Sequence, residues 1–296
     1  MNLHHLAIFH AVAETGSIRA GAARLRISQP AVSRQLREFE SRLGSVLFHR
    51  LPRGMRLTAA GEVLAGHARR IFALERQAET AMAELRDLET GHLAVGASTT
   101  IGNYLLPAVL AEYARRFPQV RVALDVGNTE QIQRDLLEDR LDVGLTEGLV
   151  SDPELRARVF MRDRLVIVAA PGFIPASTTS LRVEDLAELP WITRESGSGT
   201  RAVLEQALAA RALRPRETMA LASTEAIKRA VAAGAGIAVV SALTVASELE
   251  QGTLVRLEAG DFPPERSLHL LQRRHREPSR AAAEFVALLG AFVGRD

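Results

Sequence analysis

The sequence has 296 residues, of which 47% are apolar and 24% charged, proportions typical of a globular protein with about two domains. Cysteine is absent, which excludes disulfide frameworks, zinc–thiolate centres and thiol nucleophiles. The sequence has neither a basic leader followed by an apolar stretch nor an apolar run of about 18 residues. We therefore expect a cytoplasmic protein that does not enter a membrane.

Positive charge is concentrated at the N-terminal end. Nine arginines stand against three acidic residues in residues 1–58, a surplus of six, so with a total charge of +2 the remaining residues carry −4. This asymmetry favours binding of a polyanion by the N-terminal part. Charge alone is also compatible with an arginine-rich solvated surface.

Three short helices are predicted in the first 44 residues. Asn2 caps a helix that ends at Thr15-Gly16, and Ser17 caps an alanine- and glycine-rich helix over Ile18–Leu25 whose small side chains suit close packing. Ser28 caps a third helix, which has Pro30 in its first turn and is closed by Gly44. Two helices joined by a turn of about three residues predict a helix-turn-helix.

The outward face of the third helix is polar and basic. In a helix-turn-helix, the first residues of this helix meet base edges in the major groove. Gln29, Ser33 and Arg34 carry suitable donors and acceptors, so we expect them to read bases. The alternative is that they are only solvated. The full set expected at DNA, phosphate contacts included, is Ser28, Gln29, Pro30, Ser33, Arg34, Arg37, Arg50 and Arg53.

A β-hairpin is predicted next and would form a wing. Val46-Leu47-Phe48 and Met55-Arg56-Leu57 read as short strands on either side of the turn Pro52-Arg53-Gly54. Arg50, Arg53 and Arg56 are placed for phosphate contact or for insertion into a minor groove.

These motifs together resemble the DNA-binding domain of the LysR-type regulators. The matching positions are Phe9–Val12, Gly16-Ser17, Ala22–Leu25, Ile27–Ser33, Leu36, Glu40, Leu43-Gly44, Leu47-Phe48, Arg50 and Leu57–Gly61. The wing, Leu51–Met55, departs mildly from the common pattern. The resemblance implies a transcription regulator that binds double-stranded promoter DNA as a homodimer or homotetramer, with contact to RNA polymerase as a further possibility.

A long connecting helix follows Thr58. Its apolar residues alternate at spacings of four and three: Ala60, Leu64, His67, Ile71, Leu74, Ala78, Ala81, Leu85 and Leu88. The connecting helix would be roughly 45 Å long. An apolar seam along a helix of this length needs a partner helix to cover it. We expect it to build a dimer, as the family resemblance also implies, although the seam could instead pack on its own domain.

Strands and helices alternate from Leu93 onward and predict a parallel α/β domain with two lobes. The resemblance implies the type 2 periplasmic-binding-protein fold for this part. The expected division is a winged helix-turn-helix in 1–58, a dimerising linker helix in 59–90 and an effector-binding domain in 91–296. Its first lobe takes about 91–161 and 267–296, and its second about 162–266.

Hydroxyl-rich segments stand where several strands meet helices. Ligands bind outside the carboxyl ends of strands in such sheets, often at helix N-termini that favour anions. We expect a small anionic effector between the lobes, although any one cluster could be an ordinary helix cap. Glu147 and Glu225 oppose a highly charged anion unless Arg194 or Arg201 offsets them. The residues proposed for the effector are Ser98, Thr99, Thr100, Thr129, Thr146, Glu147, Ser196, Gly197, Ser198, Thr200, Thr224 and Glu225.

The sequence offers no candidate for catalysis, and we expect neither a cofactor nor a metal. The only lysine, Lys228, does not complete a nucleotide-binding loop, and His4, His5 and His10 read as surface or packing side chains. Three rival functions can be stated; the sequence already disfavours the first, and the third does not explain a ligand domain of some two hundred residues. A solute-binding protein would need a signal peptide, an enzyme would turn its ligand over, and an architectural DNA binder would show a flat sequence preference.

Overall fold

The computed structural model describes residues 2–51, 54–84, 91–148, 150, 152–174 and 181–294. The chain folds into two compact units, Met1–Glu79 and Thr80–Asp296. The first is helical with a small hairpin, and the second is α/β, which confirms the predicted fold class. Among the described helices, none is both long and apolar enough to cross a membrane.

Three capped helices form the body of the N-terminal unit. They are α1 (Leu3–Thr15), α2 (Ile18–Leu25) and α3 (Gln29–Leu43). Side chains of Asn2, Ser17 and Ser28 accept hydrogen bonds from the first-turn amides, as predicted. Gly16 and Gly44 end α1 and α3 in left-handed conformations, so the sequence rules for starting and stopping these helices are confirmed.

Close packing of α1 on α2 depends on Gly21. A Cβ atom at this position would lie 3.0 Å from Cγ2 and 3.2 Å from the backbone nitrogen of Val12. The shared core contains Leu6, Phe9, Val32, Leu36 and Phe39, all fully buried. Burial of these side chains fixes which face of α3 remains exposed.

A two-stranded wing follows α3. Strands β1 (Phe48–Leu51) and β2 (Gly54–Leu57) pair antiparallel and form the predicted hairpin, although β1 begins two residues later than the predicted Val46–Phe48. A carboxylate oxygen of Glu40, on α3, accepts hydrogen bonds from the amides of Leu47 and Phe48 at 2.8 and 3.4 Å. Glu40 therefore holds the start of the wing against the third helix.

The connecting helix α4 runs over Ala59–Glu84, and the hydroxyl of the preceding Thr58 accepts from the amide of Gly61 in its first turn. The residues of the predicted seam separate into two groups. Leu64 and Ile71 pack against the N-terminal core, whereas Ala60, His67, Leu74 and Ala78 are exposed. Leu85 and Leu88 lie outside the described residues.

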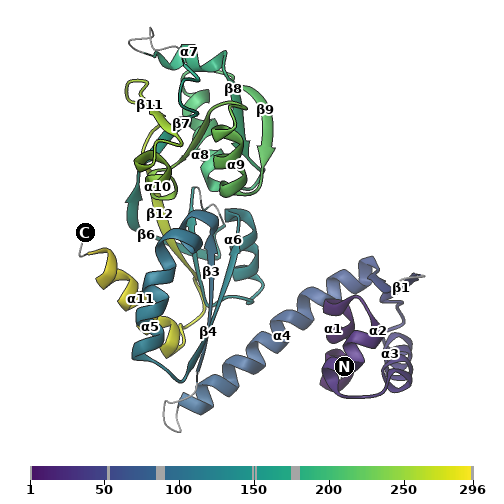
Figure 1. Ribbon diagram of the computed structural model, residues 1–296. Coiled ribbons are helices and arrows are strands. Elements are labelled where there is room, and N and C mark those ends of the chain that lie inside the picture. The colour runs from purple at the N-terminus through teal and green to yellow at the C-terminus, as the bar shows by residue number, and fades with distance from the viewer. Residues whose placement is uncertain are drawn as a thin grey trace. The chain divides into compact units, whose positions relative to one another are not determined.

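The first lobe of the C-terminal unit is built on a five-stranded sheet in the order β4-β3-β5-β12-β6. Its strands are β3 (Gly91–Ser98), β4 (Val120–Gly127), β5 (Val143–Glu147), β6 (Leu155–Asp163) and β12 (Arg266–Arg273). The helical segments are a π-helix (Ile101–Leu105), α5 (Leu106–Arg116), α6 (Thr129–Leu137) and α11 (Arg280–Val293). Figure 1 shows α5 and α11 beside each other in this lobe.

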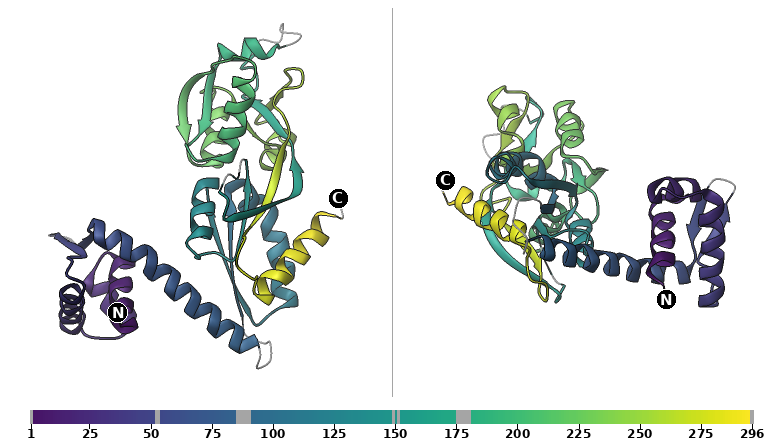
Figure 2. Two further views of the ribbon diagram at one scale, coloured as in Figure 1. Left: turned by 180° about the vertical axis from the view of Figure 1, so that it is seen from behind. Right: turned by 90° about the horizontal axis from the view of Figure 1, so that it is seen from below.

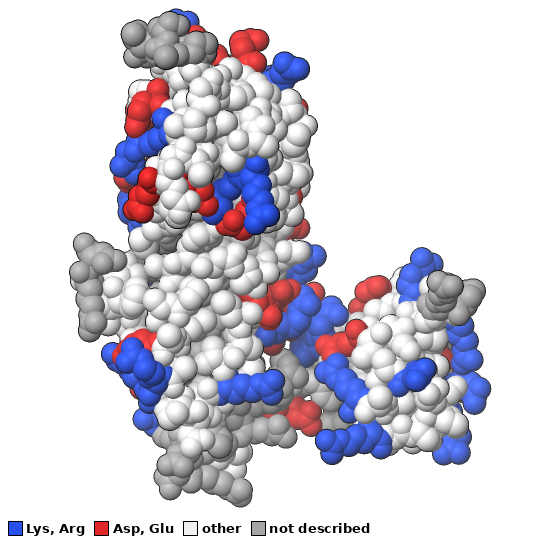
Figure 3. Space-filling model, in the orientation of Figure 1, with Lys and Arg blue, Asp and Glu red and all other residues white. Residues whose placement is uncertain are grey.

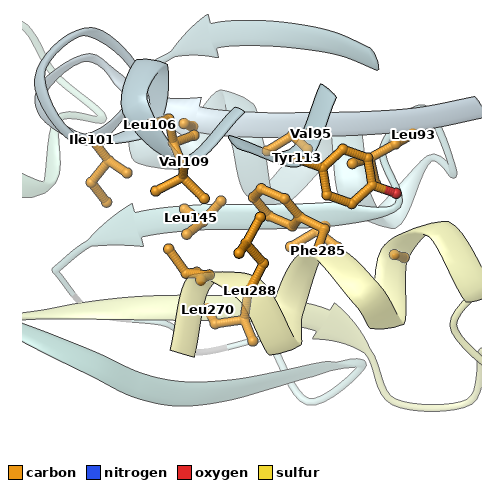
Figure 4. Packing of buried hydrophobic residues seen from close by; sticks show 14 of the residues in the cluster. Leu93, Val95, Ile101, Leu106, Val109, Tyr113, Leu145, Leu270, Phe285 and Leu288 are labelled. Atoms are coloured by element: carbon orange, nitrogen blue, oxygen red, sulfur yellow. The ribbon is translucent and has the colours of Figure 1, made fainter. Parts of the chain in front are cut away.

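The main core of this lobe lies between the sheet, α5 and α11. Phe285 of α11 lies between Val109 and Tyr113 of α5 (Figure 4). Its ring meets the Tyr113 ring edge-on, with the two ring centroids 5.9 Å apart. The hydroxyl of Tyr113 donates to the carbonyl of Ala281 at 2.9 Å, which satisfies its buried polar atom. A smaller core around Ile132 and Leu136 places α6 against the sheet.

The second lobe has two small sheets. Strand β7 (Leu165–Ala169) pairs antiparallel with β10 (Ala238–Ser241) and β11 (Val255–Leu257), and β8 (Pro190–Arg194) pairs parallel with β9 (Arg216–Leu221). The bridge Trp191–Ile237 joins them. Helices α7 (Val183–Ala187), α8 (Gly199–Ala209), α9 (Thr224–Ala232) and α10 (Ala246–Glu250) complete the lobe.

Two long strands, β6 and β12, lead from one lobe to the other (Figure 2). They pair antiparallel with each other, and β12 is antiparallel to β5, so the sheet is mixed and not purely parallel as predicted. Strand β6 also escaped prediction. Its residues are largely exposed and include three arginines, so it lacks the apolar alternation by which strands are recognised.

Candidate functional site

The exposed face of α3 carries the residues expected at DNA. Gln29, Pro30, Arg34 and Arg37 are exposed, and Ser33 is half-buried. Ser28 is exposed at the N-cap and uses its hydroxyl to accept from the amide of Ala31 at 3.4 Å, which leaves it chiefly a structural role. Among the described residues, Arg34 and Arg37 take part in no ion pair.

Wing residues add to this positive surface. Arg50 is exposed on β1, in register with Met55, and Arg56 is exposed on β2. Arg53 lies outside the described residues. Figure 3 shows basic side chains distributed over the visible face of the N-terminal unit. An exposed cationic face with few internal counter-charges is suited to phosphate contacts.

A buried arginine, Arg266, stands at the centre of the predicted effector residues. Its Nη1 donates to the hydroxyl of Thr200 at 2.6 Å and its Nη2 to that of Thr100 at 3.3 Å. Thr100 follows β3 of the first lobe and Thr200 lies in the first turn of α8 in the second. The guanidinium of Arg266 therefore joins hydroxyl groups from both lobes.

Two carboxylates balance this arginine. Asp163 accepts from Nε of Arg266 at 2.6 Å and from the hydroxyl of Ser241 at 2.7 Å. Glu147 lies 3.4 Å from Nη1 of Arg266, and also accepts from the hydroxyl of Ser98. All three charged side chains are buried, so each depends on the others for compensation of its lost hydration.

Several other predicted residues border this cluster. The hydroxyl of Thr129 donates to the carbonyl of Glu147 at 2.8 Å, while Asn128 provides the cap of α6. The hydroxyls of Thr146 and Ser198 are buried and have no hydrogen-bond partner among the residues that the structure describes. Ser198 occupies the N-cap position of α8 without making a cap bond. These two hydroxyls are therefore available to a further polar group.

The segment before α8, which contains Ser196 and Gly197, contacts the first lobe through its backbone. The carbonyl of Gly197 accepts from the amide of Glu130 at 3.2 Å, and the carbonyl of Ser196 accepts from the side-chain amide of Asn128 at 3.4 Å. Thr99 accepts from Nη2 of Arg194 at 3.5 Å. These contacts join the start of α6 to the segment before α8, and the end of β3 to the end of β8.

Thr224 and Glu225 belong to a separate group. Glu225 accepts from the hydroxyl of Tyr104 in the first lobe and pairs with Lys228 at 2.7 Å. Burial alone lowers the pKa of Lys228, but hydrogen bonds to Glu225, Glu248 and Tyr104 outweigh it and raise this pKa above its ordinary value. Thr224 is buried beside Ser223, which is an ordinary cap for α9.

Arg194 and Arg201, which were expected to offset the negative charges of Glu147 and Glu225, pair with other carboxylates. Arg194 pairs with Glu195 at 2.8 Å, and Arg201 pairs with Glu205 at 2.7 Å and Glu217 at 3.2 Å. Arg266 and Lys228 offset Glu147 and Glu225 instead. Sequence patterns did not single out Arg266, which stands directly before the largely apolar segment Ser267–Gln272.

A pocket of about 410 Å³ adjoins the buried cluster. It is lined by one face of α8 and by Gly148, Pro264, Glu265, Arg266, Ser267 and His269. His269 lies opposite Thr146 in the β5–β12 pair, and burial lowers its pKa. The volume lies within the range of small-molecule sites.

Comparison with known proteins assigns both parts of the chain to one family. Residues 3–62 match the family described as bacterial regulatory helix-turn-helix protein, lysR family, and residues 86–293 match the LysR substrate binding domain. The RuBisCO operon transcriptional regulator of Allochromatium vinosum is 34% identical over 96% of this chain and 94% of its own length.

Two solved structures are also similar. The CcmR regulatory domain of Synechocystis PCC6803, in complex with 2-PG, is 29% identical with a TM-score of 0.64, and the match covers 69% of this chain and 98% of that one. Full-length CbnR complexed with its target DNA is 22% identical with a TM-score of 0.71, covering 100% and 99%. The family matches and the curated relative confirm a DNA-binding transcription regulator with an effector-binding domain, and not an enzyme. The chain belongs to the LysR family of transcription regulators.

Proposed function

We propose that this regulator binds promoter DNA as a homodimer or homotetramer and alters that binding when a small anionic effector enters between the two lobes. In this proposal, residues 1–58 read DNA, residues 59–90 pair subunits and residues 91–296 sense the effector. The altered geometry would act through DNA bending or through contact with RNA polymerase. A ligand shifts such an equilibrium only if it binds one state more tightly.

The DNA-binding half of the proposal assigns different tasks to the arginines of α3. Arg34 lies near the start of the helix, where side chains reach base edges. The paired N–H donors of its guanidinium group suit the two acceptors of guanine. Arg37 lies one turn further along and would bind a phosphate. Both are exposed and have no ion-pair partner among the described residues, so no internal bond has to break.

Replacing Arg34 by alanine tests the base-reading role. We expect the R34A variant to lose about 1–3 kcal/mol of specific binding and to relax its preference at one base position. Selection from random DNA, followed by titration of the best site, measures both. Arg42→Ala is a matched control, since it removes an exposed charge from the last turn of the same helix. An unchanged preference in R34A would exclude Arg34 as a reader.

The effector-binding half depends chiefly on one observation: Arg266 contacts hydroxyls from both lobes, Thr100 at 3.3 Å and Thr200 at 2.6 Å. A ligand in this place would therefore act on both lobes at once. The hydroxyls of Thr146 and Ser198, which no described residue contacts through a hydrogen bond, add two buried hydrogen-bonding groups. The bound 2-PG in the similar CcmR regulatory domain supports a small-molecule effector here too.

Thermal unfolding of the full chain tests the sensor. The ligand panel contains sulfate, phosphate, phosphorylated sugars and small carboxylates. A ligand at about 100 times its Kd should add ~2.7 kcal/mol of stability. Thr200→Ala should abolish this gain, whereas Ser223→Ala should keep it, because the Ser223 hydroxyl only caps α9. A gain that survives in T200A would place the ligand elsewhere, and no gain with any anion would contradict an anionic effector.

Subunit pairing is tested by solution mass. The exposed seam residues Leu74 and Ala78 on α4 would be covered in a dimer, as Leu74 is 66% exposed in the single chain. Light scattering should give two or four times the chain mass of 32.1 kDa. Leu74→Glu should reduce that mass or weaken association, and a monomeric wild type would contradict the proposal.

A further inference from the structure

Glu147 uses its carboxylate to bind donors from both lobes. One oxygen accepts from the hydroxyl of Ser98, at the end of β3. The other accepts from the hydroxyl of Thr200 at 3.5 Å and lies 3.4 Å from Nη1 of Arg266. The side chain is 2% exposed, so this carboxylate is enclosed by its partners.

The backbone around Glu147 is held in place. Its carbonyl accepts from the hydroxyl of Thr129 at 2.8 Å. A Cβ atom on Gly199 would lie only 1.9 Å from that same carbonyl, so the start of α8 is packed directly on the end of β5. While this packing is intact, rotation of the Glu147 side chain is the movement that releases the carboxylate from Thr200 and Arg266.

The donors that Glu147 occupies are those proposed for the effector. A free anion placed between Ser98, Thr200 and Arg266 would accept the same hydrogen bonds and meet the same positive charge. We propose that the Glu147 carboxylate is an internal counter-ion in the anion position of the cleft, and that an anionic effector binds by displacing it from Thr200 and Arg266. This inference rests on the proposed function and names the group with which the effector competes.

Of the two carboxylates on Arg266, Glu147 is the replaceable one. Asp163 lies 2.6 Å from Nε and is held on its other oxygen by Ser241 at 2.7 Å. Glu147 approaches Nη1 only at 3.4 Å. A third negative charge added beside both carboxylates would be repelled in a poorly hydrated site, so exchange is favoured over simple addition.

Glu147→Gln tests the exchange. Glutamine keeps the size of the side chain and one acceptor but removes the charge that competes with the ligand. We expect E147Q, as the full chain, to bind inorganic sulfate or phosphate at least about tenfold more tightly than the wild type in calorimetric titration. Glu188→Gln is the matched control, because it makes the same charge change at an exposed residue at the end of α7.

The outcomes separate this inference from the function on which it rests. Tighter binding in E147Q with unchanged binding in E188Q, or binding seen only in E147Q, supports displacement. Equal or weaker binding in E147Q overturns the inference and leaves an anionic effector intact. Failure of both proteins to bind any anion overturns both. If E147Q does not fold, Glu147→Asp serves instead. The shorter side chain of aspartate withdraws the carboxylate from Thr200. An affinity of E147D for sulfate or phosphate equal to that of the wild type would contradict displacement.

Discussion

The DNA-binding face and the effector cleft use arginine in opposite ways. Arg34 and Arg37 on α3 are exposed and form no ion pair among the described residues, whereas Arg266 is buried and bound to two carboxylates and two hydroxyls. A phosphate can therefore reach the first pair without breaking a bond. Under the displacement proposed above, a ligand at Arg266 would have to replace a partner that is already there. Affinity at the two sites should consequently respond to different variables: salt at the first, and internal charge at the second.

Removal of the buried arginine should produce the largest effect. Arg266→Ala leaves Asp163 and Glu147 buried without compensation, so we expect a loss of about 3–5 kcal/mol in the free energy of unfolding. Urea denaturation measures the loss. Arg256→Ala, in a surface pair with Glu258, should cost no more than about 1 kcal/mol. Similar losses in the two variants would remove the contrast between buried and exposed arginines.

Contact of α8 with β5 can be broken by one methyl group. In Gly199→Ala the new Cβ would meet the Glu147 carbonyl at 1.9 Å, and we expect a loss of about 1–3 kcal/mol on unfolding. Gly290→Ala on α11 is a control of opposite sign. Its Cβ meets nothing within 4 Å, so lower flexibility of the unfolded chain should stabilise it by about 0.5–1 kcal/mol. A neutral G199A would mean that the two elements separate easily.

An exposed arginine should affect DNA binding and hardly anything else. Arg37→Ala should lower affinity for all DNA sequences alike and reduce the slope of log affinity against log salt by about 0.9. Its free energy of unfolding should stay within about 0.5 kcal/mol of the wild type. Titrations at several salt concentrations and one denaturation curve are sufficient. An unchanged slope would show that Arg37 touches no phosphate.

The smallest effect concerns pH. Burial lowers the pKa of His269 in the folded state below its ordinary value of 6.5, so the unfolded chain binds the proton more readily. His269 therefore contributes no instability above pH 6.5 and destabilises the fold progressively as pH falls below it. His269→Gln should flatten the decline in unfolding free energy below pH 6.5. A decline as steep as in the wild type would place the responsible group elsewhere.

Local sequence rules were sufficient to predict the three helices of the N-terminal unit. Asn2, Ser17 and Ser28 cap the helices, Gly16 and Gly44 end them, and the intervening apolar spacing chooses the buried face. Each of these signals lies within a few residues of the structure that it determines.

The centre of the cleft depends on pairings that no local rule contains. Arg266 meets Asp163 and Thr100 only because β12 and β6 return antiparallel between the lobes, and β6 has no clear strand pattern. Prediction therefore found the hydroxyl groups at the strand ends. It missed the arginine that connects them and the pairing of Lys228 with Tyr104.

Lys228 gives the protein an unusual chemical property. It is the only lysine in the chain, and its side chain is 7% exposed, covered by Tyr104 from the other lobe and by Glu225 and Glu248. Acylation of a lysine ε-amine in this protein can occur only where these groups have moved apart. A single modified peptide in a mass spectrum would then report how often the ε-amine is released from these three groups, without any label having been introduced.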